Sequence, residues 1–326
     1  MQPPHFWSGD AAGRDAAPLL QALLAPLGAV YGWGAAARRA WTRPAPIPIP
    51  IVCIGNLTLG GAGKTPVARA IRRKLGEGAH VLSRGYGGAA RGPLRVAADA
   101  SFREVGDEPL LHAGDGPAWI ARDRVAGAEA AVAGGARALI LDDGFQNPTL
   151  KPDLSIIVID AEAGLGNRRV FPAGPLRERA ADGLKRADAI LLQAGSRAAA
   201  ESATFPFDGP VLRGWLAPKA PAPSGPLVAF AGIARPRKFF DALRAAGADV
   251  QEEIPYPDHH VFDESELAWL ATLAQERGAR LVTTEKDHVR LDARRRGEIA
   301  AWPVEARFLD EAALDALLAP VRARVR

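Results

Sequence analysis

The sequence predicts an α/β protein made of two units, a larger one followed by a smaller one. Short apolar runs, of which Ile51–Ile54 is the first, alternate with helical segments, as buried parallel strands do in such folds. The 326 residues exceed the length of a typical single domain. Residues 195–226 are rich in Ala, Ser, Gly and Pro without a long apolar period, which favours a boundary there. We therefore expect an N-terminal helical segment at 1–43, the larger unit at 44–215 and the smaller unit at 216–326.

The composition suits a globular protein that binds an anionic partner. Hydrophobic residues make up 48% of the chain, and 41 basic residues against 37 acidic ones give a net charge of +4. This balance is compatible with nucleic acid, phospholipid headgroups or a phosphorylated substrate. Cys53 is the single cysteine, so an intrachain disulfide is excluded, and its place in an apolar run predicts a small buried side chain.

An uncharged stretch at residues 16–37 is the main feature before the first strand. It is long enough to cross a bilayer, but Pro18, Pro26 and three glycines interrupt it. The large apolar residues of this stretch fall on one helical face: Leu19, Leu20, Leu23, Leu24, Leu27, Val30 and Tyr31. Tryptophans and arginines follow directly. Two interpretations stand, a helix lying in a membrane interface and a helix docked on the protein core.

A glycine-rich loop follows the first apolar run and precedes a helix. Its residues are Thr58, Leu59, Gly60, Gly61, Ala62, Gly63, Lys64 and Thr65. Glycines let backbone N–H groups turn toward an anion, and the helix start adds partial positive charge. A lysine then reaches the β- and γ-phosphates, and a threonine hydroxyl can ligate Mg²⁺. The general P-loop pattern has glycine where this chain has Thr58, so the alternative is a glycine-rich turn that binds nothing.

Acidic residues lie at two further points near the predicted sheet edge. Asp142 and Asp143 end the apolar run Ala138–Leu141, where a P-loop protein needs a carboxylate to hold Mg²⁺ directly or through water. Asp107 and Glu108 stand just before another helical run. Acidic residues at a helix start can be simple caps that interact with its dipole, so a catalytic role for this second pair stays open.

Two loops of the larger unit carry candidate ligand contacts. Arg84 and Tyr86 lie in a glycine-rich loop after a short strand, at the edge where open α/β sheets bind ligands. An arginine and a tyrosine there suit an anionic or sugar-bearing ligand. Arg177 is one of several arginines in the segment 168–178, which could clamp a phosphate or simply face solvent.

A histidine pair stands in a loop of the smaller unit. His259 and His260 follow Asp258 directly, and no other two histidines of the chain are adjacent. A histidine in such a loop is either structural or, where a carboxylate orients it, able to exchange protons near neutral pH. Spacing alone does not decide between these interpretations.

As an ordered set, these segments resemble the tetraacyldisaccharide 4′-kinases of lipid A biosynthesis. The segments that match, from residue 51 to 287, are Gly55–Pro66, Ser83–Gly87, Gly106–Pro109, Asp142–Gln146, Phe171–Glu178, Pro257–His260 and Thr284–Asp287. Thr58 looks like the family's own form of the phosphate loop. Ala62 stands where threonine is expected, a departure of little weight because the backbone N–H acts there. Each segment is weak alone, but the ordered set is specific.

The resemblance implies transfer of the γ-phosphate of ATP to the 4′-hydroxyl of a lipid-linked disaccharide 1-phosphate, with ATP and Mg²⁺ as cofactors. It implies two α/β/α domains that close over the site, the larger one a P-loop domain with a mostly parallel sheet. It also implies attachment to the cytoplasmic face of the inner membrane, as a peripheral or monotopic protein, through the amphipathic helix of residues 1–43. Nothing in the sequence indicates an oligomeric state.

The resemblance also implies roles for particular residues. Lys64 and the loop at 58–65 would hold the ATP phosphates, and Lys64 would stabilise charge on the transferred group. The metal would be organised by Thr65, Asp142, Asp143 and Glu108. The substrate would be contacted by Arg84, Tyr86 and Arg177.

The base that activates the acceptor hydroxyl would combine residues of both units. By resemblance, Asp107 would pair with a histidine of the smaller unit, with His259 as first choice and His260 as second. A histidine oriented by a carboxylate can take a proton from a sugar hydroxyl near neutral pH.

Two other classes of protein are less compatible with the motifs. P-loop switch or partitioning ATPases that act on a protein partner and carry Gly-Gly-x-Gly-Lys-Thr usually have a lysine before the two glycines, where this chain has Leu59. A nucleic-acid-binding protein would suit the positive charge, but no reading motif is present and the arginines are dispersed. We therefore expect no nucleic-acid partner.

Overall fold

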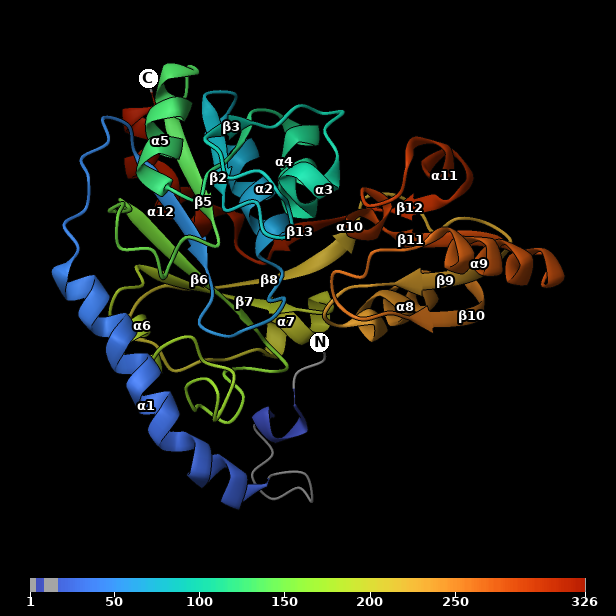
Figure 1. Cartoon of the computed structure of the whole chain (residues 1–326), viewed down its shortest axis with the longest axis horizontal. Coiled ribbons are helices and arrows are strands. Elements are labelled where there is room, and N and C mark those ends of the chain that lie inside the picture. The colour runs from blue at the N-terminus through green and yellow to red at the C-terminus, as the bar shows by residue number, and fades with distance from the viewer. Residues whose placement is uncertain (1–3, 9–16, 326) are drawn as a thin grey trace.

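The computed structural model, which describes residues 4–8 and 17–325, contains a nine-stranded sheet and a four-stranded sheet (Figure 1). The predicted fold class is confirmed: the protein is α/β, with a larger, mostly parallel sheet, a smaller unit and an N-terminal apolar helix. Residues 1–3 and 9–16 of the predicted segment at 1–43 lie outside the described residues. Of the rest of that segment, a short 3₁₀ helix covers His5–Trp7 and α1 covers Pro18–Trp41.

The nine-stranded sheet is parallel through its centre and antiparallel at both edges. The neighbours from β8 through β4 all run parallel, whereas β13 and β3 pair antiparallel with them. In spatial order the strands are β13 (Val304–Phe308), β8 (Val211–Pro218), β7 (Ala189–Ala194), β6 (Leu154–Asp160), β1 (Ile51–Gly55), β5 (Ala138–Asp142), β2 (Ala79–Ser83), β4 (Ala118–Ile120) and β3 (Leu94–Arg95).

Strand β1 lies in the middle of this sheet and is buried on both faces. Val52 and Ile54 face a cluster that includes the helices α2 and α12, while Ile51 and Cys53 face a second cluster beside α5. A strand covered on both sides must be apolar throughout, which explains the uninterrupted run of apolar residues. The helices of this unit are α2 (Lys64–Leu75), α3 (Phe102–Val105), α4 (Asp107–Asp115), α5 (Arg124–Ala133), α6 (Ala180–Leu184), α7 (Arg197–Ser202) and α12 (Glu311–Arg324).

The smaller sheet is parallel throughout and has helices on both faces. Its strands in spatial order are β10 (Asp249–Pro255), β9 (Pro226–Ala231), β11 (Arg280–Thr284) and β12 (Ala300–Trp302). Phe239 and Phe240 of α8 (Pro236–Ala245) pack on one face, and Leu267 and Leu270 of α9 (Glu264–Glu276) pack on the other. Two short helices, α10 (Glu285–His288) and α11 (Ala293–Glu298), connect β11 to β12.

The division between the units differs from the predicted boundary at residue 215. Strand β8 runs across that position as part of the larger sheet. After β12 the chain returns to the larger sheet, because β13 pairs antiparallel with β8 from Val304 opposite Pro218 to Phe308 opposite Gly214. Helix α12 then packs against α2 and lies with the larger unit (Figure 1). The half-exposed strand β8 lacks an apolar run, so its composition resembled that of a linker.

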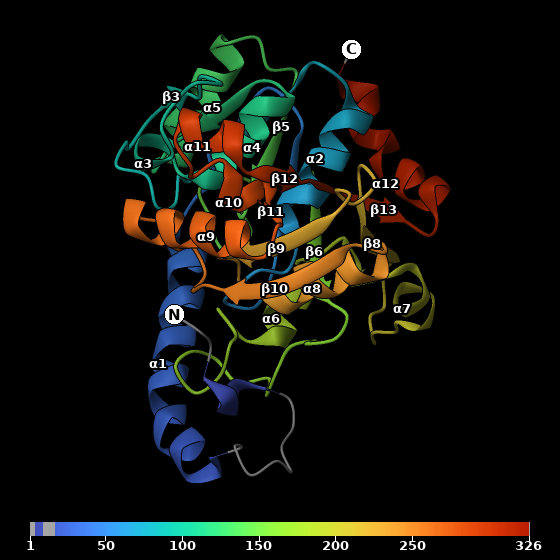
Figure 2. The same ribbon diagram turned by 90° about the vertical axis from the view of Figure 1, so that its right-hand side faces the viewer.

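Helix α1 contacts the rest of the protein along a narrow face. Gly28 and Gly32 are its buried residues, and both approach Val170. A Cβ at Gly28 would come within 2.8 Å of the Val170 carbonyl oxygen, so glycine permits this close contact. Large side chains elsewhere on α1 are exposed, with Leu19 at 87% and Trp33 at 70%. Figure 2 shows the helix projecting beyond the larger unit. Among the described residues, α1 is the single helix long and apolar enough to cross a membrane.

The burial of His80 on β2, in the larger sheet, can be tested through the pH dependence of stability. Its Nδ1 accepts a hydrogen bond from Trp119 Nε1 at 3.1 Å, and burial with the charges of Arg95 and Arg72 lowers its pKa from 6.5 to about 4. The unfolded chain therefore binds the proton more tightly, so this contribution is complete above about pH 6.5 and falls as the pH drops toward 4.

Urea denaturation of a His80→Gln variant and its parent measures this contribution. Between about pH 7 and pH 5 the parent should lose about 2 kcal/mol more of its free energy of unfolding than the variant does. An equal loss in both proteins would contradict a neutral buried His80.

Candidate functional site

A cavity of about 510 Å³ lies between the two units. One wall is formed by the glycine loop at 61–65 and by residues at the carboxyl ends of β6 and β7. The other wall is formed by the segment 233–245 around α8 and by Thr284–Lys286. Ligands of open α/β sheets bind at the carboxyl ends of the strands, and the volume suits a small-molecule ligand.

The glycine loop presents its second half to this cavity. Gly61, Ala62, Gly63, Lys64 and Thr65 line it, and α2 begins at Lys64. Gly63 has φ of +77°, which a side chain rarely adopts, and a Cβ there would approach Gln193. The first N–H groups of a helix lack intrahelical partners and attract anions. This half of the loop therefore has the geometry of a phosphate site.

The first half of the loop is held by the segment 171–178 instead. The Leu59 N–H donates to the Pro175 carbonyl oxygen at 2.7 Å, and Thr58 forms an isolated bridge with Leu176. Neither Thr58 nor Leu59 lines the cavity, and neither does Gly60, whose φ is +113°. Of the residues predicted to bind ATP, these three shape the loop and do not border the cavity.

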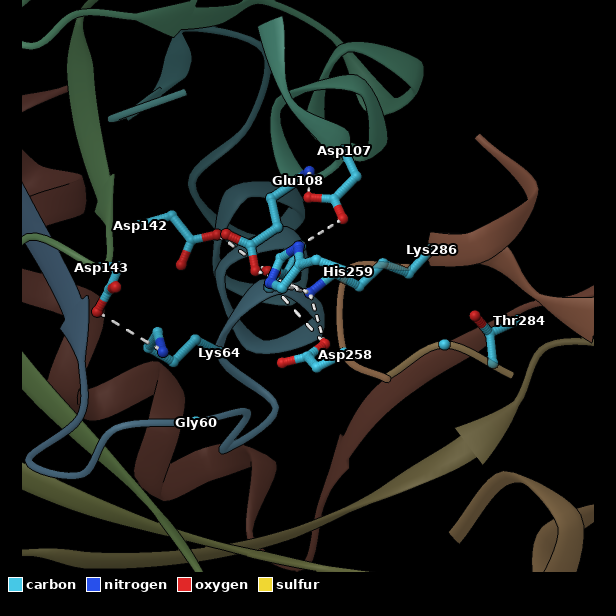
Figure 3. Close-up of polar contacts among 12 residues, drawn as sticks. Gly60, Lys64, Asp107, Glu108, Asp142, Asp143, Asp258, His259, Thr284 and Lys286 are labelled. Atoms are coloured by element: carbon cyan, nitrogen blue, oxygen red, sulfur yellow. Dashed lines mark hydrogen bonds and ion pairs between the residues drawn. The ribbon is translucent and has the colours of Figure 1, made fainter. Parts of the chain in front are cut away.

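Lys64 forms an ion pair with Asp143 (Figure 3). Arg177 contacts the same carboxylate. Lys64 Nζ lies 3.6 Å from the Asp143 carboxylate, and Arg177 Nη1 donates to both of its oxygens at 2.9 and 3.0 Å. Burial by itself would raise the pKa of Asp143, but the charges of Lys64 and Arg177 lower it below its usual value. Asp143 is thus a charged carboxylate that holds the lysine of the loop. Arg177, predicted to contact substrate, is engaged here with Asp143.

Asp142, at the end of β5, offers one open carboxylate oxygen. Its Oδ2 accepts hydrogen bonds from Thr65 Oγ1 at 3.1 Å and from His112 Nε2 at 2.8 Å. Its Oδ1 is buried and has no hydrogen-bond partner among the described residues. Carboxylate and hydroxyl oxygens are ligands that Mg²⁺ accepts, so Asp142 and Thr65 fit that ion. In the described part of the chain, no cluster of three or more His, Cys, Asp or Glu could hold a metal by itself.

Asp107, the first residue of α4, meets His259 of the smaller unit across 152 positions of sequence (Figure 3). His259 Nδ1 lies 2.9 Å from Asp107 Oδ2, and Arg290 Nε donates to the same oxygen at 2.8 Å. The Glu108 N–H donates to Asp107 Oδ1 at 2.8 Å. Burial alone would raise the pKa of Asp107, but the His259 hydrogen bond and the charges of Lys286 and Arg290 hold it well below its usual range. Asp107 therefore remains a carboxylate.

The second ring nitrogen of His259, Nε2, lies beside Lys286, a residue that lines the cavity. Because a carboxylate only accepts, Nδ1 carries the proton that binds Asp107 and Nε2 is left as an acceptor. Lys286 Nζ lies 3.3 Å from Nε2 and 3.3 Å from the Glu108 carboxylate. The exposed ring of Tyr86 packs edge-on against the His259 ring at 5.3 Å between centroids. His259 is thus oriented through Nδ1 by the charge of Asp107, while its Nε2 has Lys286 as its neighbour.

His260 is held in a different way. Its Nε2 lies 2.9 and 2.8 Å from the two carboxylate oxygens of Glu266, and its ring stacks on Tyr256 at 4.6 Å. These partners belong to the smaller unit and lie away from Asp107. Arg84, predicted to bind substrate, is exposed and forms no ion pair within the described residues.

Several residues of the site were not identified from the sequence. Arg290 is buried between two carboxylates, Asp107 and Asp287, and its Nη1 donates to Asp287 Oδ1 at 2.8 Å. Lys286 contacts Glu108 and His259. Its segment, Thr284–Asp287, resembles the family in sequence, but the sequence analysis predicted no role for this lysine. His112 was also missed, although it is the one polar residue in the buried run Leu110–His112 of α4. Only the tertiary structure shows that these three side chains contact residues of the site.

Comparison with known proteins connects the site to one enzyme family. The family model described as tetraacyldisaccharide-1-P 4′-kinase (LpxK) matches residues 20–322. A tetraacyldisaccharide 4′-kinase of Hyphomonas neptunium is 52% identical over 98% of each chain. One of Rhodospirillum centenum is 51% identical over 98% of this chain and 97% of the relative. The crystal structure of LpxK from Aquifex aeolicus, described as an "apo" form in complex with ATP, superposes with a TM-score of 0.74 at 26% identity. It covers 93% of this chain and 99% of that chain.

Replacing Arg290 tests the buried charge cluster. Arg290→Met would leave Asp107 and Asp287 without their shared cation, and breaking such a buried pair costs about 3–5 kcal/mol. We expect a loss of that order in the free energy of unfolding measured by urea denaturation.

The matched control is Arg277→Met, because the ion pair of Arg277 with Glu252 is exposed. That variant should lose less than about 1 kcal/mol. Equal losses in the two variants would show that the Arg290 cluster adds no more to stability than a surface pair.

Proposed function

This chain belongs to the tetraacyldisaccharide 4′-kinase family, and from that membership we propose how its own residues carry out the reaction. The protein is an ATP-dependent kinase that phosphorylates the 4′-hydroxyl of a tetraacyldisaccharide 1-phosphate in lipid A biosynthesis. A P-loop switch acting on a protein partner is not favoured, since relatives that match nearly the whole chain bear the kinase name.

The observation that carries the proposed mechanism is the contact between Asp107 and His259. The two residues come from different units and meet beside the cavity that the glycine loop lines. A base beside a phosphate loop is what transfer to a sugar hydroxyl needs, because the hydroxyl must lose its proton as the new O–P bond forms.

The loop at 61–65 and Lys64 would bind the ATP phosphates. The ion pair between Lys64 and Asp143 at 3.6 Å shows that the ammonium group reaches an anion at this position. Phosphate oxygens would compete for the same ammonium group, with the free N–H groups at the start of α2 as further donors. Electrostatic stabilisation of this kind is the main contribution to phosphoryl transfer.

Mg²⁺ would bind at Asp142 Oδ1 and the Thr65 hydroxyl. When bound, the ion neutralises negative charge on the phosphates. Asp142 Oδ1 is buried and has no partner among the residues that the structure describes, which makes it the open ligand among the predicted acids. Asp143 is paired with Lys64 and Arg177, and Glu108 with Lys286, so we assign these two carboxylates to the surroundings of the metal.

His259 would act as the base through Nε2. In this conformation Lys286 lies at that nitrogen, and the acceptor hydroxyl of the lipid would take its place. Nε2 accepts the proton of the hydroxyl, and Asp107 stabilises the imidazolium that forms. A positioned base of this kind contributes roughly 10²- to 10⁴-fold to the rate. The exposed Tyr86, beside His259, and the exposed Arg84 of the same loop would contact the substrate, and Arg177 would act through Asp143.

Comparison of two histidine variants tests the assignment of the base. His259→Ala should lower the rate of phosphoryl transfer from labelled ATP to a tetraacyldisaccharide 1-phosphate by roughly 10²- to 10⁴-fold. His260→Ala removes a neighbouring histidine that Glu266 holds away from Asp107, so it should reduce the rate far less. The reverse order would reassign the base to His260.

We further propose that α1 attaches the protein to the cytoplasmic face of the inner membrane. Within the part of the chain that the structure describes, most of its large apolar side chains are exposed, with Leu23 at 74% and Trp41 at 81%. Arg38 is exposed in its last turn, where it can meet an anionic surface. ATP is a cytoplasmic substrate and the acceptor is a membrane lipid, so an enzyme bound at that face reaches both.

Charge introduced on α1 tests this attachment. Leu23→Glu with Leu27→Glu should move the protein from the vesicle fraction to the soluble fraction in flotation with phosphatidylethanolamine–phosphatidylglycerol vesicles. The control is Trp269→Glu on α9, an exposed aromatic of the smaller unit, which should leave flotation unchanged. Continued flotation of the α1 variant would place the anchor elsewhere.

A further inference from the structure

We infer that His112 is a positioning residue that fixes the Asp142 carboxylate and thereby sets which of its oxygens meets the cation. The inference rests on the proposed function, in which Asp142 ligates the metal that accompanies ATP. His112 itself touches neither substrate nor metal, and acts through Asp142.

The contact between the two side chains is fully enclosed. His112 lies on α4 with an exposed fraction of 0%, and the Asp142 side chain is 1% exposed. His112 Nε2 and Asp142 Oδ2 are 2.8 Å apart. A carboxylate has no proton to give, so Nε2 must be the donor. Water cannot replace this hydrogen bond at such burial, so the direction of the carboxylate depends on the histidine.

The hydrogen bonds divide the two oxygens of Asp142 into different roles. Oδ2 receives two donors, His112 Nε2 and Thr65 Oγ1. Oδ1 is buried and receives none from the described residues. An unpartnered buried carboxylate oxygen is costly, which points to a ligand for it outside the protein chain. Saturating Oδ2 therefore presents Oδ1 to the cation.

Helix α4 links this function to the base. Asp107 is its first residue and His112 lies five positions later on the same short helix. The helix packs against α2, β2 and β4, which keeps it in register with the phosphate loop and the sheet edge. Hydrogen bonds around a metal ligand orient it, and their loss weakens metal binding by about 10- to 100-fold. One rigid helix therefore orients both the base and the metal carboxylate.

The experiment compares side chains at position 112 that do and do not reach Asp142. His112→Gln places an amide donor near the position of Nε2, whereas His112→Asn is too short and His112→Leu has no donor. The probe is Mn²⁺ with a non-hydrolysable ATP analogue and no lipid acceptor, followed by electron paramagnetic resonance. We expect a 10- to 100-fold weaker Mn²⁺ affinity for Leu and Asn, and an affinity within a few-fold of the parent for Gln. If the Leu variant fails to fold, the comparison of Mn²⁺ affinity between the Gln and Asn variants tests the role of His112.

A control and a second readout separate positioning from packing. His80→Gln replaces a different buried histidine, which lies on β2 and not on α4, and should leave Mn²⁺ affinity unchanged. In turnover, the Leu and Asn variants should require more Mg²⁺ for half-maximal rate while the KM for the lipid acceptor stays at the parent value. Unchanged Mn²⁺ affinity in both variants, or failure of Gln to restore it, would overturn the inference.

The Asp142→Asn variant distinguishes the inference from the function on which it rests. If this variant binds Mn²⁺ as the parent does, the proposed metal ligand is wrong. If it loses Mn²⁺ while the His112 variants retain it, Asp142 is the ligand and only the role of His112 is overturned.

Discussion

The buried carboxylate of Asp107 is the point on which the arrangement of the two units depends. It receives His259 and Arg290 from the smaller unit, and Arg290 continues to the buried Asp287. Charges in such surroundings are stable only while all their partners are in place, because an unpaired buried charge carries a large desolvation cost. The same cluster therefore joins the units and orients the histidine that we propose as the base. One set of contacts thus supplies both the binding energy between the units and the orientation of the proposed base.

Other ion pairs cross between the units around the same cavity. Arg69 of α2 pairs with Glu285 at 2.6 Å, and Lys238 of α8 pairs with Asp160 at 2.9 Å. All four residues line the cavity together with residues 61–65 of the glycine loop, so these contacts hold the smaller unit beside it. A base delivered by the second unit is assembled only when the units are together, which disfavours ATP hydrolysis without an acceptor.

Helix α1 is also tied to the site through a short series of contacts. Arg39 of α1 pairs with the buried Glu178 at 3.1 Å, and Gln146 donates both to Glu178 and to the Asn56 carbonyl oxygen beside the loop. The segment 171–178 in turn holds the first half of the glycine loop. The helix that we propose as the anchor and the loop that we propose for ATP thus share one supporting segment. This arrangement suits an enzyme whose two substrates come from the membrane and from the cytoplasm.

The fold class, the central strands and the family could be predicted from the sequence alone, and the glycine loop before α2 was recognised there as a candidate phosphate site. These depend on local properties: apolar runs predict buried strands, and glycines followed by Lys64 and Thr65 predict a helix start that receives phosphate. Tertiary structure alone decided what depends on pairing between distant segments. Strand β8 belongs to the larger sheet because it pairs with β7 on one side and with the returning β13 on the other, against the predicted boundary at residue 215. Arg177 turned to Asp143, and His259 reached Asp107 while its neighbour His260 was held by Glu266. Side-chain chemistry is local and can be read along the chain, whereas the partner of a charge is set by packing between residues that lie far apart in sequence.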